Sequence, residues 1–340
     1  MTRGAPWTVV DAGGTASVVR GRRGRAEHPS VNPASVGEHA AAAGMRALFA
    51  DIARAAPGNG PTWFATAGLD PATPGEELGR IQAGAAAVRF GGSVAVSSDI
   101  VALLLVGLLG TGDGRLPRRA ADAGAVAVVS GTGSGVRAGG LDAPPVTIGS
   151  QEYLASDEGS AFALAQDGLR AAVRAKDGRD PASMLTERFE QRTGRPLDRL
   201  ARDLARTPYP KTAVAALADV VTGAWQDGDA AAGDVVERAL EDLETAALAG
   251  VRQAGLQPGW RAVLAGGVFS GSAAMRDAFG RRLTAAGAAE SMTVLDPAES
   301  VFRSLSTAAD PIPRSWLGSA VWVLDPAAWL GDLPTAGRGG

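Results

Sequence analysis

The chain has 340 residues and a net charge of −3, with 46% hydrophobic and 20% charged residues, a balance typical of globular proteins. This length suits two domains of about 150 residues each. The absence of cysteine excludes disulfides, thiolate metal sites, iron–sulfur clusters and cysteine nucleophiles. With only two histidines and no net positive charge, the composition also disfavours a Ser-His-Asp triad and nucleic-acid binding.

Membrane insertion and secretion are not expected. The longest uncharged apolar run, residues 100–110, is too short to cross a bilayer. The N-terminal segment lacks the apolar core and the cleavage site of a signal peptide. We therefore expect a cytoplasmic protein whose chemistry depends on carboxylates, hydroxyls and glycine-rich backbone.

The first twenty residues predict a strand, a glycine turn and a second strand. Residues 7–10 are β-branched or aromatic, Asp11-Ala12-Gly13-Gly14-Thr15 follows, and 17–20 are again strand-like. Asp11 lies at the end of the first strand, where two roles are open. It either caps the turn, or it supports Mg²⁺ through water beside a bound phosphate.

A second strand that ends in a carboxylate is predicted at 94–99. Residues 94–96 are apolar, Ser98 and Asp99 follow, and an apolar helix is expected over 100–109. Asp99 suits the N-cap of that helix. In a kinase, a carboxylate at this place can accept the proton of the attacking hydroxyl. The sequence leaves both roles open.

The strand–glycine–strand pattern recurs at 125–137, around Ser130-Gly131-Thr132-Gly133-Ser134, and partially at 262–269, around Gly266-Gly267. Glycine turns expose several backbone N–H groups in one direction, so two such turns after apolar strands favour phosphate binding over plain turns. A P-loop is excluded because Gly-x-x-x-x-Gly-Lys-Ser/Thr is missing. The first two copies of the strand–glycine–strand pattern lie more than 100 residues apart. This spacing indicates a duplicated α/β domain rather than an array of short repeats.

Alanine-rich stretches between these strands predict helices at 36–55, 74–90, 155–175, 181–193, 211–226, 230–254 and 272–286. Strands early in each half, with helices after them, indicate α/β layers. We place the domains at 1–118 and 119–317, and expect a helix over 318–334 to complete the first domain.

Adjacent carboxylates stand before the helix predicted at 155–175, in Asp157-Glu158-Gly159-Ser160. Acidic residues at this place usually cap the helix that follows. Carboxylates also bind vicinal sugar hydroxyls, because each oxygen accepts a charge-assisted hydrogen bond. Both interpretations stay open at this point.

Together these motifs resemble the N-acetylglucosamine kinase family, which is related to the BadF/BadG/BcrA/BcrD ATPases of the actin/hexokinase/heat-shock ATPase superfamily. Residues 11–15 and 130–134 are similar to its two phosphate motifs, and 157–161 to its Gly-Asp-Glu-Gly-Ser-Ala stretch. Residues 226–230 are similar to its Glu-Gly-Asp-Pro turn, and 264–268 to its adenosine-side glycine pair. The resemblance implies an α/β fold of two similar actin/hexokinase-type (ribonuclease H-like) domains with a nucleotide cleft between them.

The resemblance also implies a function: ATP and Mg²⁺ as cofactors, and phosphorylation of an amino sugar, N-acetylglucosamine first, at O6. It makes Asp99 the catalytic base and Asp11 the metal residue, through water. It implies sugar contacts at Asn32, Ser98, Asp99, Thr132 and Asp157, and ATP contacts at Gly13, Gly14, Thr15, Gly131, Thr132, Gly133, Gly266 and Gly267.

The sequence departs from the family pattern at three places. Ala12 and Ser156 replace glycines, and Gly149-Ser150-Gln151-Glu152-Tyr153 stands where the family has Gly-Gly-Trp-Gly near the sugar. Glucosamine, another modified hexose or a muramic-type sugar are therefore alternative substrates. The absence of cysteine argues against the iron–sulfur activator branch and the zinc-containing sugar kinases. A regulatory ATPase of the same fold is the non-kinase alternative. We expect no nucleic-acid or membrane partner, and a homodimer is left open.

Overall fold

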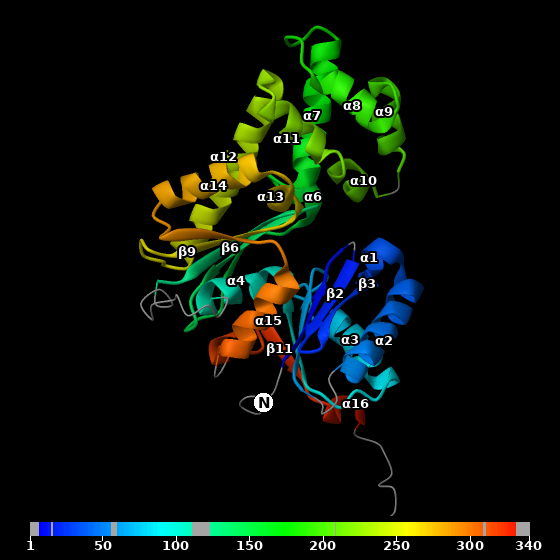
Figure 1. The fold of residues 1–340 in the computed structure, drawn as a ribbon, viewed down its shortest axis with the longest axis vertical. Coiled ribbons are helices and arrows are strands. Elements are labelled where there is room, and N and C mark those ends of the chain that lie inside the picture. Colours follow the sequence, from blue (N-terminus) through cyan, green and yellow to red (C-terminus); the bar gives the residue numbers. More distant parts are fainter. Residues whose placement is uncertain are drawn as a thin grey trace, which may run out of the picture. The chain divides into compact units, whose positions relative to one another are not determined.

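The computed structural model describes residues 7–14, 16–55, 60–110, 123–207, 209–308 and 311–330. The chain divides into two compact units. The described residues of the first lie within Met1–Pro117, Leu141–Pro144 and Asp296–Gly340, and those of the second within Arg118–Gly140 and Pro145–Leu295. In Figure 1 the first unit thus combines the blue and cyan start of the chain with its orange and red end.

A six-stranded sheet forms the centre of the first unit, in the order β11-β5-β4-β1-β2-β3. Its strands are β1 (Thr8–Ala12), β2 (Ala16–Gly21), β3 (Gly24–Pro29), β4 (Thr62–Thr66), β5 (Val94–Ser98) and β11 (Val321–Leu324). β1, β4 and β5 are parallel, and the other pairs are antiparallel. β4 and β5 are buried along their whole length, as parallel strands covered on both faces should be.

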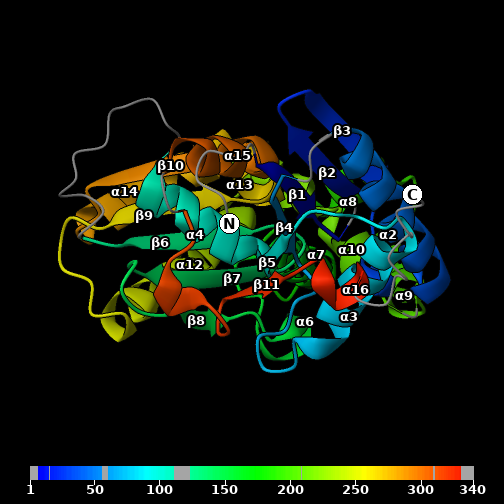
Figure 2. The ribbon, with the colours of Figure 1, turned by 90° about the horizontal axis from the view of Figure 1, so that it is seen from below.

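Helices cover both faces of this sheet (Figures 1 and 2). α2 (Glu38–Ala55) and α3 (Gly75–Ala87) pack on one face, where Phe49 and Ile81 join Phe64 of β4 in one core. α4 (Asp99–Leu109) packs against α15 (Pro297–Thr307), which contacts β1 and β2. Shorter elements are α1 (Pro33–Val36), the 3₁₀ turn Arg314–Trp316 and α16 (Ala327–Leu330).

The second unit repeats this topology. Its sheet has the order β10-β9-β6-β7-β8, from β6 (Ala125–Ser130), β7 (Ser134–Gly139), β8 (Val146–Gly149), β9 (Arg261–Ala265) and β10 (Glu290–Val294). β6, β7 and β8 form an antiparallel meander, and β9 and β10 add in parallel beside β6, as β4 and β5 do beside β1. The duplication predicted from the sequence is confirmed.

Nine helices of the described residues belong to the second unit. They are α6 (Glu152–Ala155), α7 (Ala161–Lys176), α8 (Leu185–Thr193), α9 (Leu197–Ala205), α10 (Lys211–Ala215), α11 (Ala218–Gln226), α12 (Ala230–Gln253), α13 (Gly267–Gly271) and α14 (Ala273–Ala285). α12 packs on β6, β7 and β8, and α14 on β9 and β10. α7 joins this layer to α8, α10 and α11, which with α9 form a helical subdomain at one end of the unit (Figure 1).

The C-terminal segment differs from the sequence prediction. The helix expected over 318–334 is wrong in its first part, because Val321–Leu324 form β11, which pairs antiparallel with β5. Val321, Trp322 and Val323 are β-branched or aromatic residues, which favour strands. A short helix follows only at Ala327–Leu330. The chain also returns to the first unit at Asp296, whereas the sequence placed this return at 318.

Two further predicted elements are corrected. The helix expected over 211–226 is interrupted between Ala215 and Ala218, and the strand expected after Gly266-Gly267 is the helix α13. None of the helices in the described ranges is both long and apolar enough to span a bilayer.

Candidate functional site

Two other carboxylates, Asp99 and Asp296, act on Asp11 in the first unit. Asp11 lies in β1, Asp99 follows β5, and Asp296 precedes α15. Burial, with added like charge from Asp99 and Asp296, raises the pKa of Asp11 to about 7. A cation near Asp11 would therefore relieve unfavourable charge. In the part of the chain that is described, no three His, Cys, Asp or Glu side chains group closely enough to hold a metal ion by themselves.

Ser98, rather than Asp99, caps α4. The Ser98 Oγ accepts a hydrogen bond from the Val101 N–H at 3.3 Å. Asp99 is the first residue of the helix, and its Oδ1 accepts from the Ile100 N–H at 2.8 Å. The N-cap role considered for Asp99 thus falls to its neighbour, and the Asp99 carboxylate is not needed for that purpose.

The glycine turn of the first unit holds the segment that contains Asn32. The Gly13 N–H donates to the Ala16 carbonyl at 3.0 Å, and the Gly13 carbonyl accepts from the Ser30 Oγ at 3.0 Å. That hydroxyl in turn accepts from the Asn32 N–H at 3.1 Å. Gly14 belongs to the same turn, and Thr15 lies outside the described residues.

The substitution of alanine for the family's glycine at position 12 is compatible with this geometry. Ala12 is a buried strand residue of β1, paired with Ser17 of β2 and Thr66 of β4. Extended strand backbone accommodates a Cβ atom without strain. The departure therefore does not disturb the turn that follows.

Two glycine motifs of the second unit lie side by side. A Cβ atom at Gly131 would be 3.8 Å from the Gly267 N and 3.9 Å from the Gly266 Cα. Gly266 has a φ of +104°, and a Cβ there would lie 2.3 Å from the Ser130 carbonyl oxygen, so only glycine fits. The Gly131 N–H donates to the Gly133 carbonyl at 2.9 Å, which leaves Thr132 at the centre of the turn.

The two most specific sequence motifs, Ser130–Ser134 and Asp157–Ser160, are hydrogen-bonded to each other. The Asp157 Oδ1 accepts from the Ser134 N–H at 2.8 Å, the Ser134 Oγ donates to the Glu158 carbonyl at 2.8 Å, and the Ser130 Oγ donates to the Gly159 carbonyl at 2.8 Å. A Cβ on Gly133 would lie 2.7 Å from the Asp157 Oδ1. Asp157 is only 4% exposed, and its carboxylate is buried against the glycine turn.

Lys211, at the start of α10, completes this arrangement, and sequence reasoning missed it. Its Nζ lies 2.7 Å from the Asp157 Oδ2 and 2.7 Å from the Glu152 Oε2. Burial lowers the pKa of Lys211, but hydrogen bonds to Asp157 and Glu152 outweigh it and raise the pKa overall. Lys211 is remote in sequence from both carboxylates, and no local motif signals the contact.

The loop that replaces the family's Gly-Gly-Trp-Gly has unusual backbone. Ser150, Glu152 and Asp157 have φ values of 63°, 62° and 71°, in the left-handed region. Each such residue costs on the order of 1–3 kcal/mol and persists only where its surroundings impose it. The Tyr209 hydroxyl also donates to the Glu152 Oε2 at 3.1 Å. The loop is therefore held in one shape by contacts with α10 and the segment before it.

The motif at 226–230 has a structural explanation. Asp229 caps α12 through the Ala232 N–H at 2.8 Å and accepts from the Ser183 Oγ and the Met184 N–H. These bonds connect α12 to the start of α8. The predicted residues thus form two groups, one in each unit: Asp11, Gly13, Gly14, Asn32, Ser98 and Asp99 in the first, and Gly131, Thr132, Gly133, Asp157, Gly266 and Gly267 in the second.

A match to a protein-family model identifies the family of this chain. The BadF/BadG/BcrA/BcrD ATPase family matches residues 111–293, more than half of the chain. The chain belongs to this family. The matched segment contains the hydrogen-bonded Ser130–Ser134 and Asp157–Ser160 motifs, the Gly266-Gly267 pair and Lys211. The relationship predicted from the motifs is confirmed.

Several solved structures are similar to this chain in fold. A proposed N-acetylglucosamine kinase from Chromobacterium violaceum is 22% identical, with a TM-score of 0.62 over 88% of this chain and 99% of that one. A second, from Porphyromonas gingivalis, is 17% identical, with a TM-score of 0.67 over 88% and 98%. A ROK family glucokinase from Streptomyces griseus, in complex with glucose and AMPPNP, is 15% identical, with a TM-score of 0.51 over 88% and 97%.

At these identities the similarity establishes the fold, and the predicted actin/hexokinase-type α/β fold is confirmed. No curated protein matches the sequence.

Proposed function

We propose that this ATPase is a sugar kinase that transfers the γ-phosphoryl group of ATP to an amino sugar, with N-acetylglucosamine as the first substrate and O6 as the acceptor. The observation that carries the proposal is the position of Asp99. Ser98 is the N-cap of α4, and Asp99, the first residue of that helix, lies close enough to Asp11 for its charge to raise the pKa of Asp11. In a kinase, a carboxylate at this place can accept the proton of the attacking sugar hydroxyl.

ATP binding is assigned to the glycine motifs. Backbone groups of Gly13, Gly14 and Thr15 in the first unit, and of Gly131, Thr132 and Gly133 in the second, suit phosphate oxygens. Gly266 and Gly267 are assigned to the adenosine side. The crowding at Gly266 supports this role, because glycine there lets the backbone of β6 and α13 come together.

Mg²⁺ fits the first unit. The charges of Asp99 and Asp296 raise the pKa of Asp11, and a divalent cation stabilises ionised carboxylates in such surroundings. Asp11 would hold the ion through water, since the described carboxylates do not form a complete ligand set. When bound with ATP, Mg²⁺ neutralises charge on the phosphates.

In the transfer step, the oxygen of the sugar hydroxyl forms a bond to the γ-phosphorus, while the bond between that phosphorus and the β,γ-bridging oxygen breaks. Asp99 accepts the proton of the hydroxyl. Asn32, Ser98, Thr132 and Asp157 are assigned to the sugar. Both oxygens of Asp157 already have partners, but each carboxylate oxygen accepts a second hydrogen bond. Lys211 and the Ser134 N–H would then fix the direction in which Asp157 receives a sugar hydroxyl.

Other acceptors remain alternatives because of the loop at 149–153. Glucosamine, another modified hexose or a muramic-type sugar would use the same Asp99 and Asp11. A regulatory ATPase of this fold would need no sugar. We also propose a cytoplasmic location.

The deciding experiment measures ADP release with Mg·ATP in the absence and presence of amino sugars, together with the mass of the sugar product. We expect N-acetylglucosamine to raise ADP release well above the sugar-free rate and to gain one phosphoryl group. If no sugar changes ATP turnover, the regulatory ATPase is the better assignment.

A further inference from the structure

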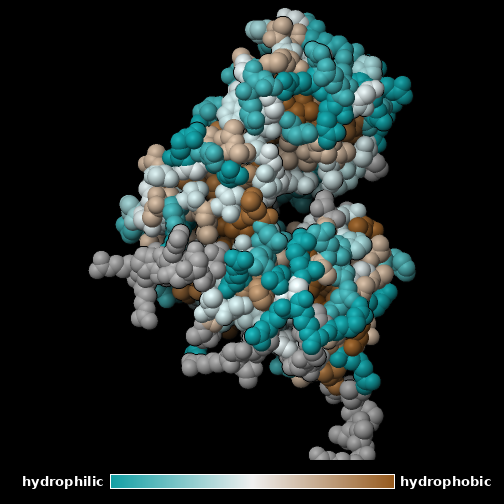
Figure 3. All heavy atoms as spheres, viewed as in Figure 1, coloured by the Kyte–Doolittle hydropathy of each residue, from teal (hydrophilic) through white to brown (hydrophobic). Residues whose placement is uncertain are grey.

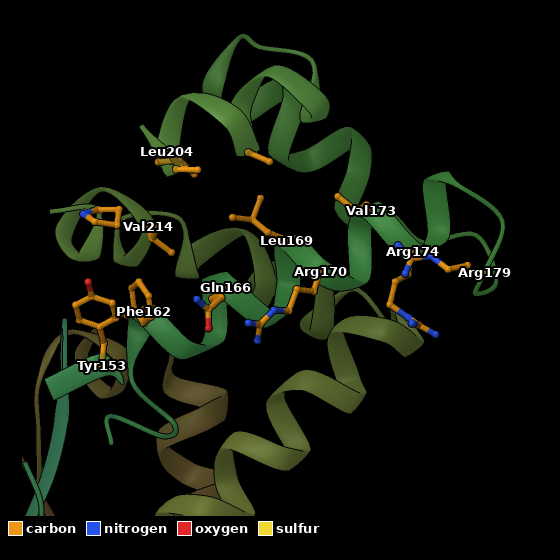
Figure 4. Close-up of a pocket in the computed structure, with 13 residues that line it drawn as sticks. Tyr153, Phe162, Gln166, Leu169, Arg170, Val173, Arg174, Arg179, Leu204 and Val214 are labelled. Carbon is orange, nitrogen blue, oxygen red and sulfur yellow. The ribbon is translucent and has the colours of Figure 1, made fainter. Parts of the chain in front are cut away.

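The helical subdomain of the second unit contains a pocket of about 560 Å³, between α7, α9 and α10 (Figure 4). Phe162, Leu169 and Val173 of α7 line one side, and Leu204 of α9 and Val214 of α10 face them. Figure 3 shows a hydrophobic patch ringed by hydrophilic residues where α7 and α9 face each other. Apolar lining and this volume are typical of small-molecule sites.

The polar end of the pocket carries little net charge. Arg170, Arg174 and Arg179 line it, as Figure 4 shows for their side chains. Each of the three faces a carboxylate, at 2.9 Å from Asp167, 2.6 Å from Asp180 and 2.7 Å from Asp177, respectively. Because these arginines are already paired, an uncharged apolar occupant is favoured over an anion.

The other end of the pocket borders the Asp157–Lys211 pair. Tyr153 lines the pocket, and its ring centroid lies 6.0 Å from the Lys211 Nζ and 4.9 Å from the Phe162 ring centroid. Pro210, the residue before Lys211, also lines the pocket. One aromatic side chain therefore separates an apolar hollow from the carboxylate to which a sugar contact is assigned.

We propose that this pocket receives an apolar acyl chain, longer than acetyl, carried on the amino group of the sugar substrate. This inference rests on the proposed kinase function and refines its substrate class. The sugar hydroxyls meet the polar side of the loop at Glu152 and Asp157, and the chain passes Tyr153 into the space bounded by Phe162, Leu169 and Val214. Contacts of Glu152 with Lys211 and Tyr209 hold this border in place.

The test compares N-acylglucosamines with acyl chains of two, four, six and eight carbons, in phosphorylation kinetics and in calorimetric binding. Each methylene group buried in an apolar site strengthens binding about fourfold. We expect KM and Kd for the six-carbon chain to lie at least tenfold below those for acetyl. Ala201→Phe places a ring in the pocket and should abolish this gain while N-acetylglucosamine kinetics stay near the parent values.

Ala213→Phe is the matched control, since Ala213 is exposed on α10 and does not line the pocket; it should keep the gain. Phosphorylation that is indifferent to chain length, or an Ala201→Phe variant that weakens all chains equally, overturns the inference and leaves the kinase proposal intact. If no sugar is phosphorylated, the kinase proposal fails. Calorimetry then still decides the pocket: tighter binding of longer chains, lost in Ala201→Phe, supports it, and no such trend overturns it.

Discussion

The two units share one sheet topology and differ in what stands at the glycine turn. In the first, β1 ends at Asp11 and Ala12, and Asp99 and Asp296 contribute further negative charge. In the second, β6 ends at Val129 and Ser130, and the nearby Asp157 is paired with Lys211. The same backbone thus presents a carboxyl whose pKa is raised by burial and nearby carboxylates in one unit, and a hydroxyl-lined turn beside an Asp–Lys ion pair in the other.

This difference suggests a division of roles. A group of neighbouring carboxylates suits a cation and a proton acceptor, whereas a turn rich in N–H groups suits phosphate oxygens. The described residues of the second unit form α6 to α12 between β8 and β9, whereas those of the first form α1 and α2 between the equivalent strands β3 and β4. We expect variants in the first unit to affect chemistry and charge, and those in the second to affect binding and shape.

The largest effect is expected for Asp99→Asn. If Asp99 is the general base, turnover should fall about 10²–10⁴-fold, because the amide cannot accept the proton. Stability should stay near that of the parent, since Ser98 caps the helix. Steady-state kinetics and urea unfolding of the same preparation measure both. As a control, Ser98→Ala should lose about 0.5–2 kcal/mol of stability through the missing cap. Turnover of Asp99→Asn within a fewfold of the parent removes Asp99 from catalysis.

Gly266→Ala tests the close approach of the two glycine motifs. The added Cβ would lie 2.3 Å from the Ser130 carbonyl oxygen, at a φ of +104°, so the turn must shift. We expect a loss of about 2–4 kcal/mol in unfolding free energy and much weaker ATP binding. Gly271→Ala is the matched control, because nothing lies within 4 Å of its added Cβ. Equal stability and ATP affinity in both variants would argue against a tight contact at Gly266.

Lys211→Met tests the ion pair between Lys211 and Asp157 in the second unit. Removing the ammonium leaves the buried Asp157 carboxylate without its ion-pair partner, which should cost about 2–3 kcal/mol and raise the sugar KM more than it lowers kcat. Lys211→Arg should restore part of both. Lys176→Met, which removes exposed pairs with Glu190 and Asp198, should cost less than about 1 kcal/mol. A Lys211→Met variant as stable as Lys176→Met would mean that water replaces the ammonium.

The fold was largely predictable from the sequence because its signals are local. A β-branched run before a glycine turn marks β1 and β6, and alanine-rich stretches mark α2, α12 and α14. β11 was predicted as a helix because its strand partner, β5, is more than 200 residues away, and pairing decided its structure. Lys211 was missed for the same reason. Its function as a partner of Asp157 and Glu152 depends on how α10 packs, which no neighbouring residue signals.

The smallest effect concerns Asp11 and pH. Its carboxyl has a pKa of about 7 when folded and about 4 when unfolded, so between these values the folded state holds the extra proton. Stability contributed by Asp11 should therefore decline as pH rises from about 4 to about 7, and stay level above that.

The measurement is the unfolding free energy of the parent minus that of Asp11→Asn, in buffer without divalent metal. Common titrations cancel in this difference, which should fall by about 1–3 kcal/mol over this range because Asp11 keeps part of its surface exposed. Added Mg²⁺ should reduce the decline, since a cation supports the ionised carboxylate. Asp70→Asn is the control: backbone and side-chain hydrogen bonds from Ala72 and Thr73 lower the pKa of this exposed carboxyl, so its contribution changes only below about pH 4. Parallel stability curves for the parent and Asp11→Asn would show that Asp11 titrates normally, and would remove its raised pKa from the comparison of the two units.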